Sequence, residues 1–193
     1  MEQRIVSFDD ELLILVDEQD NVTGYDSKRN VHRGAGLLHR AFSIFLFSAD
    51  GKVLMQRRSA NKLLWPSYWT HSCCSHPRKG EDYAAAAQRR LDEELGVTAD
   101  LELLYQFKYA AGFDGRGSER ELCAVFVGRL DAPDAVVPNA NEIAAWRWVE
   151  LAEVDHWVAV APERLTPWFL LEWRRLRGEQ RPAIAGLCRG GLH

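Results

Sequence analysis

Short apolar runs separated by polar turns predict a series of strands along this 193-residue chain. The first two runs, at 11–17 and 22–25, are joined by a polar turn and predict an N-terminal β-hairpin. Asp50-Gly51, between the runs at 41–47 and 53–57, predicts a second hairpin because Asp-Gly favours a tight turn. Further strands are expected at 101–110, 121–130 and 143–149.

Apolar residues spaced three and four positions apart predict helices. The clearest covers 82–95, where Ala84, Leu91 and Leu95 share one face and Gly96 supplies the stop. Further helices are expected at 151–157 and from 162 or 163 to 177.

This alternation of elements predicts an α/β domain, and the hairpins imply a mixed rather than a purely parallel sheet. Residues 1–177 are expected to form that single domain. After Gly178 the composition turns to Gly, Arg and Pro, which predicts a loose tail over 178–193.

Composition narrows the class of protein. With 47% hydrophobic residues and seven Trp, the chain can bury a sizeable core. A net charge of −4 gives no basic surface for nucleic acid, which is therefore not expected as a partner. No apolar run approaches the roughly twenty residues of a membrane helix, and the N-terminus does not read as a signal peptide. We therefore expect a cytoplasmic protein without membrane insertion, its four cysteines reduced.

Three histidines and two glutamates form a candidate metal site: His32, His39, His76, Glu119 and Glu121. Borderline divalent cations accept both imidazole nitrogen and carboxylate oxygen. Glu119 and Glu121 lie two apart at the start of a strand, so both carboxylates point to one face. Taken singly, each His is more often a surface or hydrogen-bonded core residue, and the glutamates could belong to a solvated turn.

Cys74 lies two residues before His76, in a segment of small polar residues expected to be a loop. A thiol beside a metal ligand and a helix N-terminus can have an altered pKa and act as an acid, base or nucleophile. The alternative is a small buried apolar residue, and it is the interpretation given to Cys73, Cys123 and Cys188.

Basic residues recur near these candidate ligands: Lys28, Arg57, Arg58, Lys62, Arg89 and Arg90. A phosphorylated substrate needs such groups, because Arg offers a fork and Lys a point charge to phosphate oxygens. Each of them could equally be a surface charge. In particular, Arg89 with Glu93 and Arg90 with Glu94 have the spacing of ion pairs on a helix surface.

The segment around the 82–95 helix resembles a degenerate Nudix box through Ser75, Glu81, Arg89, Arg90, Leu91, Glu93, Glu94, Gly96 and Val97. Ser75 stands where the family has its first Gly. Arg90 stands where the hydrolases have a metal-binding Glu, and a cation at that position argues against ordinary Nudix hydrolysis.

With these two differences, the chain resembles one branch of the family, the type I isopentenyl diphosphate isomerases. The resemblance spans about residues 10–175 in a consistent order, through His32 and His39, the segment 70–77, Tyr109, the segment 119–123 and the segment 166–168. It implies a Nudix-like α/β/α sandwich and an isomerase of isoprenoid biosynthesis. Such an enzyme interconverts isopentenyl and dimethylallyl diphosphate through a carbocation-like state.

The resemblance also implies the metal and diphosphate ligands. One ion, Mn²⁺, Mg²⁺ or Zn²⁺, would be held by His32, His39, His76, Glu119 and Glu121. A second ion, Mg²⁺ arriving with the diphosphate, would be held by Glu94. The diphosphate itself would contact Lys28, Arg58, Lys62 and Arg90.

By the same resemblance, Cys74 and Glu121 are the pair that gives and takes protons on opposite faces of the substrate. Tyr109 would polarise Glu121 or relay its proton. Trp168 would offer a π face that stabilises positive charge by about 2 kcal/mol when desolvated.

Two rival functions remain. A Nudix hydrolase is disfavoured by Arg90 and by Cys74, for which hydrolysis has no use. A binding module that has lost its chemistry would lack an acid or base, yet Cys74, Tyr109 and Glu121 are all present.

Overall fold

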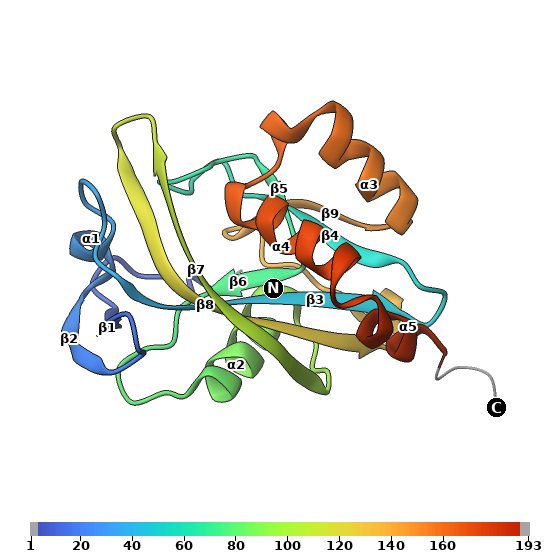
Figure 1. Ribbon diagram of the computed structural model, residues 1–193, viewed down its shortest axis with the longest axis horizontal. Helices are drawn as coiled ribbons and strands as arrows, with labels where there is room; N and C mark the ends of the chain where they lie inside the picture. Colours follow the sequence, from blue (N-terminus) through green and yellow to red (C-terminus); the bar gives the residue numbers. More distant parts are fainter. Residues whose placement is uncertain (1–3, 190–193) are drawn as a thin grey trace.

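The computed structural model describes residues 4–189, which form a nine-stranded sheet between two helical layers (Figure 1). The strands are β1 Leu12–Val16, β2 Val22–Ser27, β3 His39–Ser48, β4 Val53–Arg58, β5 Trp69–Thr70, β6 Cys73–Ser75, β7 Leu101–Phe113, β8 Gly117–Leu130 and β9 Ile143–Val149. The helices are α1 Lys28–Val31, α2 Tyr83–Leu95, α3 Leu151–Val160, α4 Pro167–Gly178 and α5 Arg181–Arg189, with 3-10 turns η1 Pro133–Ala135 and η2 Pro162–Arg164.

The sheet is mixed, as predicted. Its central strand β3 runs parallel to β8 and antiparallel to β1, β4 and β6. The N-terminal hairpin is confirmed by the pairing of β1 with β2. The Asp50-Gly51 hairpin is confirmed as well, because Phe47 pairs with Val53 and Gly51 adopts a positive φ of 84°.

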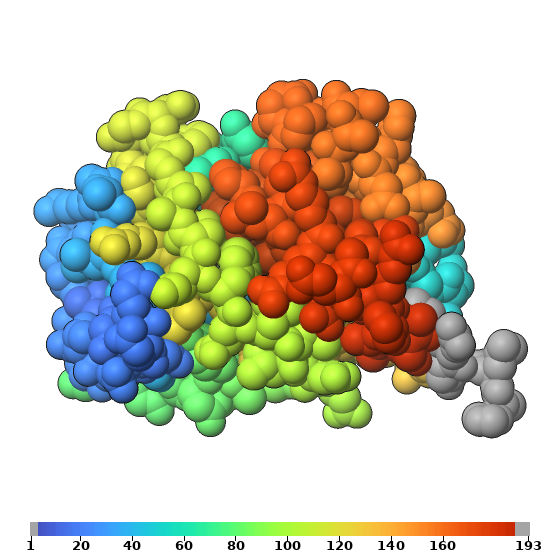
Figure 2. Space-filling model, viewed as in Figure 1, coloured from blue at the N-terminus to red at the C-terminus, as the bar shows by residue number. Residues whose placement is uncertain are grey.

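Strand β3 is buried on both faces, which explains its nearly continuous apolar sequence. Phe42, Ile44 and Leu46 pack in one core with Leu91 and Leu95 of α2. The alternate residues, Phe45 and Phe47 among them, pack in a second core with residues of α3, α4 and α5. The protein is therefore an α/β/α sandwich, and Figure 2 shows its orange and red C-terminal helices covering one face.

The C-terminal region differs from the sequence prediction. The expected loose tail is wrong for residues 181–189, which form α5 and bury Ile184 against the core. A single buried Ile in a segment rich in Gly, Arg and Pro gives too weak an amphipathic pattern to predict this helix from the sequence. The side chain of Cys188 and residues 190–193 lie outside the described part of the chain.

The helix expected from 162 or 163 to 177 is divided into η2 and α4. Pro167 is the reason, because the residue before a proline is pushed towards extended backbone and proline is favoured at the first helical position. The split places Trp168 in the first turn of α4. Within residues 4–189, no helix is long and apolar enough to cross a membrane.

Candidate active site

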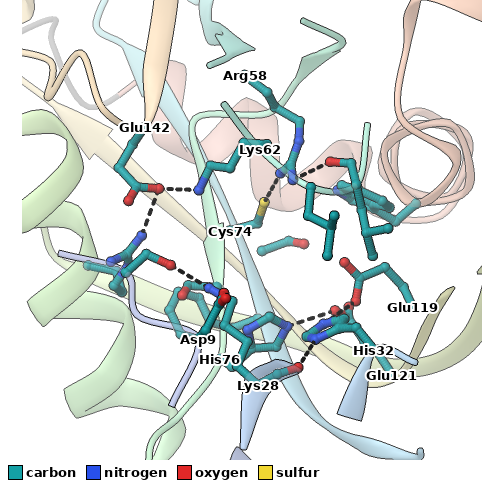
Figure 3. A pocket seen from close by; sticks show the side chains of 18 of the residues that line it. Asp9, Lys28, His32, Arg58, Lys62, Cys74, His76, Glu119, Glu121 and Glu142 are labelled. Atoms are coloured by element: carbon teal, nitrogen blue, oxygen red, sulfur yellow. Dashed lines mark hydrogen bonds and ion pairs between the residues drawn. The ribbon is translucent and has the colours of Figure 1, made fainter. Parts of the chain in front are cut away.

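A cavity of about 520 Å³ opens beside the central strands, between the N-terminal segment and the start of α4. Its lining gathers all the predicted site residues except His39 and Glu94, from elements far apart in the sequence (Figure 3). The lining members are Lys28, His32, Arg58, Lys62, Cys74, His76, Arg90, Tyr109, Glu119, Glu121 and Trp168.

The five candidate metal ligands lie together at one end of this cavity. One potential ligand atom from each of His32, His39, His76, Glu119 and Glu121 lies within 4.8 Å of all the others. The parallel register of β3 and β8 sets His39 beside Glu121, and the two-residue period of β8 brings Glu119 to the same side. The structure therefore brings these five side chains together.

Backbone carbonyls orient two of the imidazoles. His32 Nδ1 donates to Lys28 O at 2.6 Å and His39 Nδ1 donates to Leu37 O at 2.8 Å, because a carbonyl oxygen can only accept. Each ring therefore turns its Nε2 towards the carboxylates, the orientation usual for metal-bound histidine. His32 Nε2 lies 2.7 Å from Glu119 Oε2; burial lowers the pKa of His32, but the Glu119 carboxylate outweighs it and raises that pKa. His39 Nε2 is buried without a hydrogen-bond partner among the described residues, 3.7 Å from Glu121 Oε1. This donor set fits a divalent cation.

The electrostatics of the cluster support the same fit. Burial lowers the pKa of His39 to about 4 and that of His76 well below its ordinary value, which favours the neutral, metal-binding form. Burial raises the pKa of Glu119, but His32 and His39 outweigh it and hold that pKa at about 2. Burial and the neighbouring Glu119 raise the pKa of Glu121 well above its usual range. Two adjacent buried carboxylates thus resist a second negative charge, which a bound cation would offset.

Candidate proton-transfer groups face the cavity next to this cluster. Tyr109 Oη donates to Glu121 Oε2 at 2.5 Å. Cys74 was expected in a loop, but it lies in β6 and pairs with Ser43 of β3, so its position is fixed by the sheet. Burial raises the pKa of Cys74 to about 12 despite the Arg58 guanidinium 3.8 Å from its sulfur, which keeps it a thiol at neutral pH. Cys73 and Cys123 are buried, as expected.

Four cationic residues line the same cavity: Lys28, Arg58, Lys62 and Arg90. Arg58 donates to the carbonyls of Leu64 at 2.9 Å and Trp65 at 3.1 Å, and its guanidinium lies 5.4 Å from the Trp168 ring centre. Burial, followed by the charge of Lys62, lowers the pKa of Lys28 to about 8. Several positive charges therefore share a confined space, which favours an anionic ligand.

The helix ion pairs proposed as an alternative are also present. Arg89 Nη1 lies 3.0 Å from Glu93 Oε2, and Arg90 pairs with Glu94. The Arg90 pair is not a surface pair, however, because its side chain is 2% exposed and lines the cavity.

Sequence reasoning missed Glu142, which holds the cations together. Its carboxylate pairs with Lys62 and lies 3.3 Å from Arg90 (Figure 3). Burial raises the pKa of Glu142, but the two cations outweigh it and lower that pKa to about 2. No local pattern marks Glu142, because it stands 80 residues from Lys62. The rim segment containing Ser7 and Asp9 was missed as well.

Most of the chain matches known proteins in sequence. The NUDIX domain model matches residues 37–169. The isopentenyl-diphosphate Delta-isomerase of Serratia proteamaculans is 44% identical over 179 residues, covering 93% of this chain and 98% of that protein. The protein of the same name from Burkholderia multivorans is 41% identical over 160 residues, covering 83% and 89%.

Solved structures share the fold. The DR0079 protein of Deinococcus radiodurans superimposes with a TM-score of 0.70 at 25% identity, covering 86% of this chain and 98% of that one. The MutT protein of Methanosarcina mazei superimposes with a TM-score of 0.61 at 18% identity, covering 75% and 96%. The sandwich is therefore common to these proteins, whereas the chemistry of the cavity depends on its own residues.

Proposed function

We propose that this chain, which belongs to the isopentenyl-diphosphate Delta-isomerases of the NUDIX family, interconverts isopentenyl and dimethylallyl diphosphate in isoprenoid biosynthesis. The observation that carries the proposal is the content of one cavity. A thiol, Cys74, and a carboxyl–tyrosine pair, Glu121 with Tyr109, lie beside a cluster of cations that suits a diphosphate. Hydrolysis of a diphosphate has no need of the thiol.

Moving the double bond requires a proton added at one carbon and another removed two carbons away. Cys74 and Glu121 would serve as these two groups, since both reach the same cavity from different strands. The raised pKa of Cys74, about 12, keeps a proton available on sulfur. Tyr109 would orient Glu121 and relay its proton through their hydrogen bond. General acid and base groups of this kind each contribute about 10² to 10⁴ in rate.

Protonating an alkene generates positive charge on carbon, which water would trap. The Trp168 ring lines the cavity and is 3% exposed, with Trp65 packed edge-on at 5.0 Å. An aromatic face in a dry site stabilises such a charge by about 2 kcal/mol. We assign Trp168 this role.

The diphosphate would be bound by Lys28, Arg58, Lys62 and Arg90, which all line the cavity. Lys62 and Arg90 are already paired with Glu142, so phosphate oxygens would replace a carboxylate rather than meet free charges. Glu94 would hold the Mg²⁺ ion that arrives with the diphosphate, once Arg90 turns from its carboxylate to the phosphate.

The His/Glu cluster would hold Mn²⁺, Mg²⁺ or Zn²⁺ through His32, His39, His76, Glu119 and Glu121. An ion bound there would offset the charge of the paired carboxylates and fix Glu121 in place.

The proposed setting is the cytoplasm, with a small isoprenoid diphosphate as the partner and no nucleic acid. Proton transfer by Cys74 needs a reduced thiol, and the described cysteines are free, including the adjacent Cys73. A reducing compartment preserves that state. The net charge of −4 offers no electrostatic attraction to nucleic acid.

One experiment tests the proposal. The protein is incubated with isopentenyl diphosphate and Mg²⁺ in D₂O and followed by NMR. Deuterium entering a dimethylallyl product is the expected result. Release of inorganic phosphate would indicate a hydrolase instead. An unchanged substrate, with substrate and metal both shown to be bound, would refute both enzymatic functions.

A further inference from the structure

A second polar cluster, which the steps above do not use, lies buried behind the cavity wall. Glu172 of α4 is 1% exposed, and its Oε1 accepts a hydrogen bond from Ser43 Oγ at 2.7 Å. Its Oε2 lies 3.1 Å from His71 Nε2, although neither atom makes a hydrogen bond among the described residues, and both of these side chains are fully buried. A buried carboxylate lowers stability unless it is paired, so a functional role would account for its presence here.

Ser43 connects this cluster to the cavity. It lines the cavity and pairs across the sheet with Cys74, so the two side chains share one face. A serine hydroxyl has a single proton, and Ser43 gives it to Glu172. Because that proton is committed, the Cys123 thiol 3.4 Å away can only act as a donor towards Ser43 Oγ. Ser43 therefore offers the partial negative charge of its oxygen to the cavity beside Cys74.

Glu172 is also linked to the aromatic wall. It follows Trp168 by four residues on α4, so both project from the same side of that helix. The hydrogen bond to Ser43 thus ties α4 to the central strand one turn beyond the ring. The His71 ring is packed against Phe45 at 5.0 Å and Phe169 at 6.3 Å, which keeps water from the pair.

We propose that Glu172 is a positioning residue for the isomerisation, an inference that rests on the proposed function. Acting through Ser43, whose hydrogen bond fixes the carboxylate, it places negative polarity behind the carbon that becomes positive, and His71 packs beside its other oxygen. Preorganised charge in a site closed to water is effective because no solvent has to reorganise. Lys62 and Arg90 pair elsewhere, with Glu142 and Glu94, and Arg58 donates to backbone carbonyls, so Glu172 should influence the chemical step and not substrate binding.

Glu172→Gln provides the test, because the amide keeps an oxygen that accepts from Ser43 but removes the charge. We expect kcat to fall about tenfold or more, with KM for isopentenyl diphosphate within about twofold of wild type. Ser43→Ala should likewise lower kcat and leave KM unchanged, because it removes the group through which Glu172 acts. Glu179→Gln is the matched control, an exposed carboxylate at the end of the same helix that pairs with Arg175 at 2.9 Å, and it should leave kcat unchanged.

A double variant separates this role from a purely structural one. Glu172→Gln alone changes the group that lies against the buried His71 ring, which lowers stability. In the combined His71→Asn and Glu172→Gln protein two neutral amides face each other, so Tm should recover while kcat stays low. Wild-type kcat in the folded double variant would overturn the proposal, as would a rise in KM with kcat unchanged. An inactive wild-type protein would overturn the proposed function and this inference with it, whereas an active wild type with fully active variants overturns this inference alone.

Discussion

The hydrogen bond from Tyr109 to Glu121 gives the sharpest test of the proposed chemistry. Tyr109→Phe deletes one oxygen atom and keeps the ring, which stacks on Phe107 at 5.6 Å. The bond is 2.5 Å long and buried, and it would be charge-assisted once a cation bound in the cluster keeps Glu121 ionised. Such bonds contribute about 1.5–3 kcal/mol. If that contribution acts on the transition state, kcat should fall by about 10- to 100-fold.

The assay is NMR of deuterium incorporation in D₂O, with metal content measured on the same samples. Metal content should not change, because the candidate ligand atoms are untouched. Tyr105→Phe is the control, since Tyr105 lies on the same strand and its buried hydroxyl has no hydrogen-bond partner among the described residues. If kcat of Tyr109→Phe stays within about twofold of the Tyr105→Phe value, Tyr109 has no part in proton transfer.

Three further predictions address the remaining parts of the site. Cys74→Ala should abolish turnover while calorimetry still detects diphosphate binding, and retained turnover would remove Cys74 from the mechanism. Lys62→Met should raise KM for isopentenyl diphosphate about tenfold or more with a smaller effect on kcat, because it removes a charge that suits the diphosphate; an unchanged KM would contradict this. The pKa of Glu142 is lowered from 4.5 to about 2, so its ionised form stabilises the folded protein above pH 4.5 and that stability is lost as the pH falls towards 2. Urea unfolding should show wild type exceeding Glu142→Gln by about 3 kcal/mol at pH 7 and by clearly less at pH 3, and a gap independent of pH would refute the assignment.

Most of the fold could be predicted because its elements are strongly patterned. Strand β3 is apolar on both faces since two helical layers cover it, and α2 has both an amphipathic face and a left-handed Gly96 at its end. The errors arose where tertiary contacts decide the structure. Helix α5 is held through Ile184 against a core formed by distant residues. Strand β6 is too short to show a period, and its pairing with β3 is what orders Cys74.

The site residues likewise fall into those that a local sequence pattern predicts and those that only tertiary contacts bring together. The His/Glu cluster could be predicted because Glu119 and Glu121 share a strand face. The family resemblance added the three histidines. Glu142 and Glu172 could not be predicted, because their partners come from remote parts of the chain. Glu142 meets Lys62 across 80 positions, and Glu172 meets Ser43 across 129. No local spacing encodes such a pair, which exists only once the sheet and α4 have been assembled.

Arg90 is the residue for which the sequence left two alternatives, a helix ion pair or a diphosphate ligand. Under the proposed function they are successive states of one side chain. In the free protein Arg90 is buried and paired with Glu94 and Glu142. A buried guanidinium without an anionic partner is strongly disfavoured, so on binding a diphosphate Arg90 would exchange its carboxylates for phosphate oxygens rather than simply release them. Under the proposed function, that exchange leaves Glu94 free to hold the Mg²⁺ that accompanies the diphosphate. A glutamate at position 90, as in the hydrolases, would instead add negative charge beside two buried carboxylates and could not make the exchange.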